Sequence, residues 1–371
     1  MRCDARDSWS QRRRPALLAL LEASARGRGD LSLQRFDPGE VAWAIETGLG
    51  PLFFRAVRDR RENSAAPGWS WLKGADLTAR VIGGDQIQAM AEILDALSGK
   101  APPVTLLKGI SIAEEFYPEA HLRVMRDLDF LVPEESLPAV EAELGALGYE
   151  KGTNLAAERY RRHHHSAPLY HPERKIWVEV HRALFAPDRR ASAVGIFQPK
   201  SLFAQRRESD FHGRPVYRLS PELQLAYLAA HWAQEFHRVG SVTALVDAIY
   251  LLKGAGARFA WERLLRWVQG NVAATYLYLL LSYLERHRLV EVAPDVMRDL
   301  FNQQCSFGRS ALRLAHALID RFLVGGRSFG PLMSQRNVTI VWKTLLLPGP
   351  AARNWLLAPI NLSLPFSYRI Q

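Results

Sequence analysis

The spacing of apolar residues changes twice along this chain of 371 residues, which limits the folds it can adopt more than any other feature. In residues 8–100 and again in residues 219–346, apolar side chains recur at the three- and four-residue intervals of helices that bury one face. Between these stretches, apolar and polar residues alternate with period two, as in strands. We therefore predict an α+β fold in which helical segments flank a small mixed sheet.

Helix-breaking residues mark the points where the pattern changes. Pro102 and Pro103 end the first helical stretch, and Ser220 with Pro221 makes a favourable helix start. The expected parts are an N-terminal helical segment (1–100), a central α/β domain (101–218), a C-terminal helical domain (219–346) and a Pro-interrupted tail (347–371). We expect the tail to pack on the body of the protein.

Within the central part, the pattern predicts alternating strands and helices. The segments are a strand at VTLL, a helix at ISIAEEFY, a strand at DLDFLV, a helix at LPAVEAELGALGY, and two strands in APLYHPERKIWVEVHRAL joined by a turn at Pro172–Lys175. We expect the helices on one side of the sheet. Five helices should follow, in PELQLAYLAAHWAQEF, VTALVDAIYLLKG, WERLLRWVQG, TYLYLLLSYLERH and RSALRLAHALIDRFL.

Composition and cysteine usage point to a folded cytoplasmic protein. Apolar residues make up 48% of the chain and charged residues 23%, values typical of globular folds. Cys3 and Cys305 match neither a metal-ligand nor a disulfide-framework spacing, which favours a reducing compartment. No uninterrupted apolar run approaches the roughly 20 residues that span a bilayer, so we expect no stable membrane insertion.

A pair of carboxylates stands on one of the expected strands. Asp127 and Asp129 are separated by one residue, so their side chains point to the same face of that strand. Hard oxygen ligands placed side by side suit Mg²⁺, or Mn²⁺ in its place, with substrate phosphate oxygens completing the coordination. Glu179 in WVEVH is the candidate third ligand of a two-metal arrangement, and His181 shares its strand face as a candidate phosphate contact.

Candidate phosphate-binding residues precede this pair. Lys108 and Gly109 lie at an expected strand-to-helix junction, where free backbone amides and the positive helix end favour a phosphate group. Ser111 could add a hydroxyl. Arg123 has the same strand parity as the two aspartates, whereas Arg126 does not, so we expect Arg123 to make the phosphate contact.

These residues resemble a known family. LLKG, FYPEAHLRVMRDLDFLVP and WVEVH are similar to the uncharacterised bacterial nucleotidyltransferases of the polymerase-beta superfamily, over roughly residues 100–185. The resemblance implies a polymerase-beta-like palm, transfer of a nucleoside monophosphate from a nucleoside triphosphate, and magnesium dependence. The chain departs from the superfamily at Ile110, where Gly or Ser is usual, and at Glu179, where Asp is usual.

Other functions remain open at this point. The acceptor could be a small molecule, a peptide, a protein or RNA, and the base preference and oligomeric state are not encoded in any motif. A nucleotide-binding scaffold without turnover would keep the same fold. The net charge of +10 and pI near 9.8 also permit a basic nucleic-acid-binding protein, and Arg123 and Arg126 could simply form structural ion pairs with the aspartates.

Histidines suggest a further hypothesis. Three of them are consecutive, at positions 163–165, but neighbouring strand residues alternate faces, so we expect at most His163 and His165 to converge. A polar sheet face or phosphate contact is therefore favoured over zinc. In the C-terminal half, Asp247 lies in a strongly apolar helix and is predicted to be a satisfied buried group.

Overall fold

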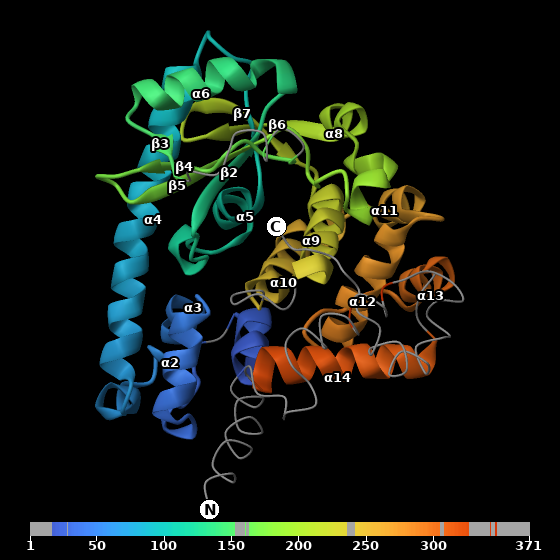
Figure 1. The fold of residues 1–371 in the computed structure, drawn as a ribbon. Helices are drawn as coiled ribbons and strands as arrows, with labels where there is room; N and C mark the ends of the chain where they lie inside the picture. The colour runs from blue at the N-terminus through green and yellow to red at the C-terminus, as the bar shows by residue number, and fades with distance from the viewer. Residues whose placement is uncertain are drawn as a thin grey trace, which may run out of the picture.

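The computed structural model describes residues 17–27, 29–152, 160, 163–235, 242–304, 308–325, 342 and 346. Both cysteines and the tail of residues 347–371 lie outside this part. Helices precede and follow a sheet, which confirms the α+β prediction (Figure 1). The four-part division of the chain stays a prediction.

The helices before the sheet follow the expected pattern with one difference. Residues 17–26 are helical, followed by α2 (Pro38–Glu46), α3 (Gly50–Val57) and the long α4 (Trp69–Leu97). The apolar spacing in residues 41–57 runs through a break between α2 and α3. Gly48 adopts a φ of 82° in that break, a left-handed conformation that no helix continues through.

Seven described strands form one mixed sheet with the order β3-β4-β5-β2-β1-β7-β6. Their bounds are β1 (Thr105–Leu106), β2 (Asp127–Leu131), β3 (Glu150–Lys151), β4 (Leu169–His171), β5 (Ile176–His181), β6 (Arg206–Phe211) and β7 (Arg214–Leu219). β2 runs parallel to β5, and β1 parallel to β7. The strands at VTLL and DLDFLV and the hairpin in APLYHPERKIWVEVHRAL are therefore confirmed.

The hairpin of β6 and β7 was not predicted. The turn between the two strands consists of His212 and Gly213, which both have positive φ, 50° and 84°. Two-residue hairpin turns require this conformation at their central positions. The short helix α8 (Pro199–Gln205) leads into this hairpin, which extends the sheet at the β1 side.

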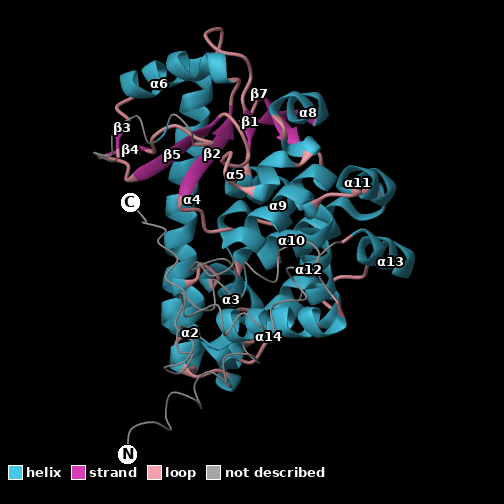
Figure 2. Ribbon diagram, turned by 45° about the vertical axis from the view of Figure 1, so that its right-hand side comes forward, coloured by secondary structure: helices cyan, strands magenta, loops and turns pink. Residues whose placement is uncertain are grey.

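Helices lie against both faces of the sheet, where the sequence pattern led us to expect them on one. One face packs into a core with α4 and α6 (Leu137–Ala146); its members include Leu128, Phe130, Val178, Val180, Leu94 and Val140. Asp127 and Asp129 have the opposite strand parity. They line a cavity together with residues of α9 (Pro221–Glu235) and α10 (Thr243–Ala255), so helices from the C-terminal half complete that side (Figure 2).

The C-terminal half is helical, as predicted. After α9 and α10 come α11 (Trp261–Val268), α12 (Val272–Arg286), α13 (Pro294–Gln303) and α14 (Arg309–Gly325), of which α13 was not predicted. Their apolar faces form one large core with α2 and α3, centred on α9, α10 and α12. Among the described residues, no helix has both the length and the apolar character to cross a membrane.

Candidate active site

Two carboxylates from adjacent strands face each other at the centre of the sheet. In the parallel pairing of β2 and β5, Asp129 is the register partner of Glu179. His181, two residues further along β5, places its Nε2 2.7 Å from Asp129 Oδ1 and 3.7 Å from Glu179 Oε2. The ligand atoms of Asp129, Glu179 and His181 lie within 4.8 Å of one another, a separation that a single metal ion can bridge.

A lysine ammonium group lies between the carboxylates. Lys108 is the first residue of α5 (Lys108–Phe116), and its Nζ is 2.7 Å from Asp129 Oδ1 and 3.8 Å from Glu179 Oε2. Its φ of 44° is uncommon for a residue with a side chain. Strained backbone of this kind is found at functional sites, where the surrounding structure holds it in place.

The environment lowers the pKa of one carboxyl group of the cluster and raises the pKa of the other two. Asp129 is 2% exposed, and Lys108 and the hydrogen bond from His181 hold its pKa well below the usual range despite burial. The negative charge of Asp129, together with burial, raises the pKa of Asp127 to about 7. Burial, followed by the charge of Asp129, raises the pKa of Glu179 to about 7. The site therefore resists full ionisation until another cation is added.

A cavity of about 320 Å³ opens beside this cluster. Its lining includes Lys108, Gly109, Arg123, Asp127 and Asp129 from the α/β part, and Gln224, Tyr227, His231, Thr243 and Asp247 from α9 and α10. Residues 45–48, at the end of α2 and in the turn that follows it, line the cavity from the N-terminal part of the chain. Three separate stretches of the chain thus build one pocket.

Tyr227 is a lining residue that sequence reasoning missed. It lies on an apolar helix and is only 1% exposed, so by sequence it resembles a core aromatic residue. Its hydroxyl is nevertheless buried without a hydrogen-bond partner in the structure, and it lies within electrostatic range of the Lys108 ammonium group. A buried, unsatisfied hydroxyl facing a cavity is suited to a bound ligand. Only its position in the fold distinguishes it from other core aromatics.

Arg123 is held by the helical half of the protein. Its Nε donates to Asp247 Oδ1 at 2.8 Å, and the Tyr117 hydroxyl donates to the same oxygen at 2.7 Å. Asp247 is 2% exposed, so it is a satisfied buried group, as predicted from its apolar helix. The ion pair with Asp247 keeps the pKa of Arg123 above its ordinary value despite burial. The ion-pair partner of Arg123 is thus Asp247, and not Asp127 or Asp129 as in the alternative in which the arginines pair with the two aspartates.

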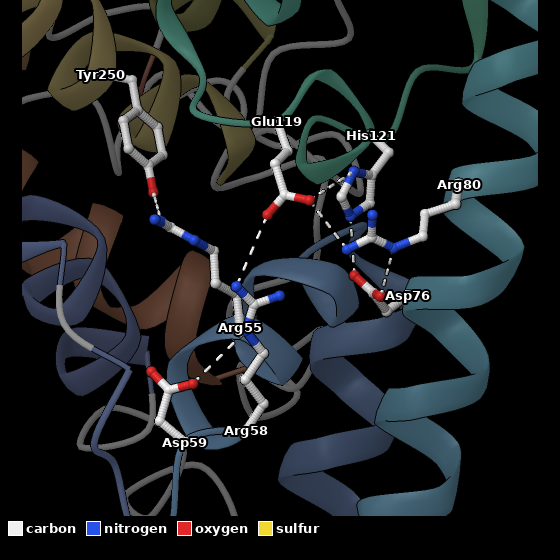
Figure 3. Close-up of polar contacts among 8 residues, drawn as sticks. All are labelled: Arg55, Arg58, Asp59, Asp76, Arg80, Glu119, His121 and Tyr250. Atoms are coloured by element: carbon white, nitrogen blue, oxygen red, sulfur yellow. Dashed lines mark hydrogen bonds and ion pairs between the residues drawn. The ribbon is translucent and has the colours of Figure 1, made fainter.

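A second polar network fixes the segment that carries Arg123 (Figure 3). Asp76 of α4 accepts hydrogen bonds from His121 Nε2 and from Arg80 Nε, both at 2.9 Å. Glu119 is 3.0 Å from Arg80 and 3.8 Å from Arg58, the residue that follows α3. Because Asp76 is 3% exposed, this network anchors the start of the segment leading to β2 against the N-terminal helices.

Gly109 and Ser111 serve α5 in ways the sequence did not indicate. A Cβ at Gly109 would lie 2.9 Å from Met125 Cγ, so glycine allows the helix start to pack against the segment before β2. Ser111 is 3% exposed, and its hydroxyl and carbonyl face Arg218 of β7. It is not among the residues that line the cavity.

The three consecutive histidines converge, and our expectation that at most two of them could do so was wrong. One ring nitrogen from each histidine lies within 4.8 Å of the corresponding nitrogens of the other two. Strand alternation does not apply to them, because the chain bends at His163 and His164, and His165 makes only an isolated bridge to His181. Burial lowers the pKa of His165 to about 3, and it also lowers the pKa of His164 and His181, so these rings are neutral at pH 7.

Replacing Lys108 with glutamine should destabilise the metal-free protein and make its stability depend more strongly on divalent cations. Glutamine can still donate a hydrogen bond to Asp129 but leaves two facing carboxylates without a counter-charge, so we expect a loss of about 1–2 kcal/mol in unfolding free energy. Thermal unfolding with chelator and then with Mg²⁺ measures this. Mg²⁺ should stabilise the variant more than the wild type. An unchanged unfolding temperature in chelator would contradict this assignment of Lys108.

Comparisons with known proteins give one clear match. The model of a family described as uncharacterised nucleotidyltransferase matches residues 38–289. No curated protein matches the chain. Among solved structures, it is similar to the solution structure of the antibiotic-resistance factor ANT(2'')-Ia, with 16% sequence identity and a TM-score of 0.34, over 54% of this chain and 97% of that chain.

Proposed function

Because the chain belongs to the family of uncharacterised nucleotidyltransferases, we propose that it transfers a nucleoside monophosphate from a nucleoside triphosphate to an acceptor with the help of Mg²⁺. The family match spans about two thirds of the chain and includes all the residues that line the pocket. This match identifies the protein as a nucleotidyltransferase. The use of Mg²⁺, the triphosphate donor and the acceptor are our proposal.

The observation that carries this proposal is the juxtaposition of Asp127, Asp129 and Glu179 with a pocket of about 320 Å³. This volume lies within the range of small-molecule sites, roughly 300–1,000 Å³. Asp127 and Asp129 line the pocket, and Glu179 faces Asp129 from β5. A nucleotide bound there would bring its phosphates next to the carboxylates.

Asp127, Asp129 and Glu179 would hold Mg²⁺, or Mn²⁺ in its place. Hard carboxylate oxygens are the ligands that these ions prefer, and the mutual repulsion that raises the pKa values of Asp127 and Glu179 favours a bound cation. When bound, the ion neutralises charge that develops on the transferred phosphoryl group and its leaving pyrophosphate. His181 orients Asp129 through its hydrogen bond.

The remaining residues position the substrate. Lys108 and Arg123 place two positive charges on the pocket wall, where they can bind the triphosphate. Gly109 exposes the start of α5 to the same space, and the buried Tyr227 hydroxyl can donate to a phosphate oxygen. Since positioning and charge neutralisation supply most of the catalysis in phosphoryl-type transfer, this small set suffices. The side chain of Ser111 has no place in this scheme.

The acceptor binds, in this proposal, on the side of the pocket formed by α9 and α10. Gln224, His231 and Thr243 supply polar groups there, and Leu228 and Trp232 supply apolar surface. We propose that the helical domain (219–346) selects the acceptor while the α/β domain (101–218) binds the triphosphate. A small molecule, a peptide, a protein side chain and an RNA end all offer a suitable hydroxyl.

Labelled nucleoside triphosphates test the proposal. The full chain is incubated with each of the four α-labelled triphosphates, Mg²⁺ and a fractionated cell extract, and the label is followed into small-molecule, protein and RNA fractions. We expect Mg²⁺-dependent label in one fraction with the wild type and none with Asp127→Asn/Asp129→Asn. Equal labelling by the two proteins in every fraction would exclude the proposed chemistry.

A further inference from the structure

A cluster of imidazole rings adjoins the carboxylates on the β5 side of the site, outside the cavity already described. The ring centroids of His163 and His165 are 4.1 Å apart, those of His163 and His164 4.3 Å, and those of His164 and His165 4.7 Å. None of the three lines the pocket that contains Asp127. The proposed transfer reaction does not use them.

The backbone of this segment is firmly held. His165 bridges to His181, and Ser166 N donates to Val180 O at 2.9 Å. On the other side, Arg182 N donates to His164 O at 2.9 Å, and the Arg182 guanidinium donates to the carbonyls of His163 and Tyr160. The convergence of the rings is therefore imposed by backbone pairing on both sides of the histidines.

The ring nitrogens of these histidines are arranged as they are in metal-binding histidines. His165 Nδ1 is 2.6 Å from the Ser166 carbonyl and therefore carries the proton, which leaves the Nε2 lone pair unprotonated. Fixing a tautomer through a backbone carbonyl is the usual second-shell arrangement of metal-binding histidines. His164 Nδ1 is buried without a hydrogen-bond partner in the structure, and the same holds for Nδ1 of His181, whose fully buried ring lies 5.3 Å from that of His164.

From this geometry we infer that His163, His164 and His165 form a binding site for a borderline-soft transition-metal ion such as Zn²⁺. Three imidazole nitrogens suit such an ion and do not suit Mg²⁺, which prefers oxygen. One nitrogen from each ring lies within 4.8 Å of those of the other two, and these three nitrogens would close to about 3.3 Å around a tetrahedral ion with bonds of about 2.0 Å. His163 and His164 are half-buried, so an ion can enter from solvent.

This site is distinct from the proposed magnesium site but lies next to it. His165 Nε2 is 3.9 Å from Glu179 Oε2, the only carboxylate oxygen within 4.0 Å of the three histidines in the described part of the chain. Glu179 is thus within reach of an ion held by the histidines. The inference goes beyond the proposed transfer chemistry, since the histidines can hold an ion whether or not the protein transfers a nucleotide.

Zinc binding by the full chain tests the inference. Chelator-treated protein is titrated with Zn²⁺ against a chromophoric competitor, with millimolar Mg²⁺ present to occupy the carboxylates. We expect one equivalent to bind, with affinity weakened on the order of 100-fold in His164→Gln and in His163→Gln. His171→Gln is the matched control, because His171 lies on β4 away from the cluster, and it should bind like the wild type.

X-ray absorption of the zinc-loaded wild type provides a readout that does not depend on any variant folding. Three imidazole ligands at about 2.0–2.1 Å are expected. A spectrum dominated by oxygen ligands would overturn the inference, as would zinc binding that survives in both histidine variants and is lost in Asp129→Asn. Binding lost in His171→Gln to the same degree as in His164→Gln would also overturn it.

Discussion

Replacing Asp127 with asparagine is expected to abolish nucleotidyl transfer while making the metal-free protein more stable. Asp127 is a proposed metal ligand, so the transfer rate should fall by about 10³-fold or more. The same carboxylate is repelled by Asp129, which raises its pKa to about 7. Asparagine removes that repulsion, and we expect the unfolding free energy at pH 8 to rise by about 1–3 kcal/mol.

The stability gained in Asp127→Asn should depend on pH. A carboxyl whose pKa is raised in the folded state destabilises the fold as pH increases through the interval from its ordinary value, 3.8, to about 7. The stability difference between Asp127→Asn and the wild type should therefore be small near pH 4 and largest above pH 7. Denaturant unfolding at several pH values measures it.

The control for Asp127→Asn is the exposed Asp188, whose replacement by asparagine should change neither stability nor transfer. Saturating Mg²⁺ should reverse the order of stability between wild type and Asp127→Asn, because only the wild type keeps both aspartates. If Asp127→Asn is less stable than the wild type in chelator at pH 8, the like-charge description of the pair is wrong.

Replacing Asp247 with alanine should be the most destabilising single change at the site. The substitution leaves Arg123 buried without its counter-ion and Tyr117 without its acceptor, and breaking a buried pair in this way costs about 3–5 kcal/mol. Because Arg123 is then free to leave the pocket wall, the KM for the triphosphate should rise as well. Chemical denaturation and the concentration dependence of transfer measure these two effects separately.

A double-mutant cycle separates the ion pair from the loss of packing. In Arg123→Met/Asp247→Leu neither charge remains, so the double variant should recover much of the stability lost in Asp247→Leu alone while transfer stays impaired. Tyr117→Phe, which removes one hydrogen bond to the same carboxylate, should cost only about 1 kcal/mol. Additive effects of the two charge substitutions would show that Arg123 and Asp247 act independently.

Periodicity predicted the elements that bury one face. It identified β2, β5 and the amphipathic helices, because each of these elements has apolar residues on one side only. It did not reveal the hairpin of β6 and β7, whose charged residues mask the alternation and whose turn signal is a His-Gly pair. It also did not predict helices on both faces of the sheet, since contacts between distant segments leave no local pattern.

The candidate site was predictable as far as strand parity extends. Parity places Asp129 and Glu179 on one face, and the observed register of β2 and β5 then sets them opposite each other. Parity does not predict which cation lies between them, and Lys108 reaches that position from the start of α5. The pairing of Arg123 with Asp247, 124 residues later, depends on packing of the helical half and has no sequence signal.

Ion pairs in the folded protein also engage many of its basic residues. Several arginines that could have formed a nucleic-acid-binding stripe are paired with acidic side chains, among them Arg80, Arg174, Arg207, Arg214 and Arg263. Pairing of this kind neutralises positive charge locally, which supports a small anionic ligand in the pocket over a long polyanion on the surface.

Since the pocket draws its walls from residues 45–48, from the sheet and from α9 and α10, it exists only when segments about 200 positions apart have met. During synthesis on a ribosome, a growing chain that has released β5 already carries the acidic cluster but has no Asp247 to hold Arg123. The proposed transfer therefore requires the chain to be synthesised through α10, which supplies both the pocket wall and the carboxylate that holds Arg123.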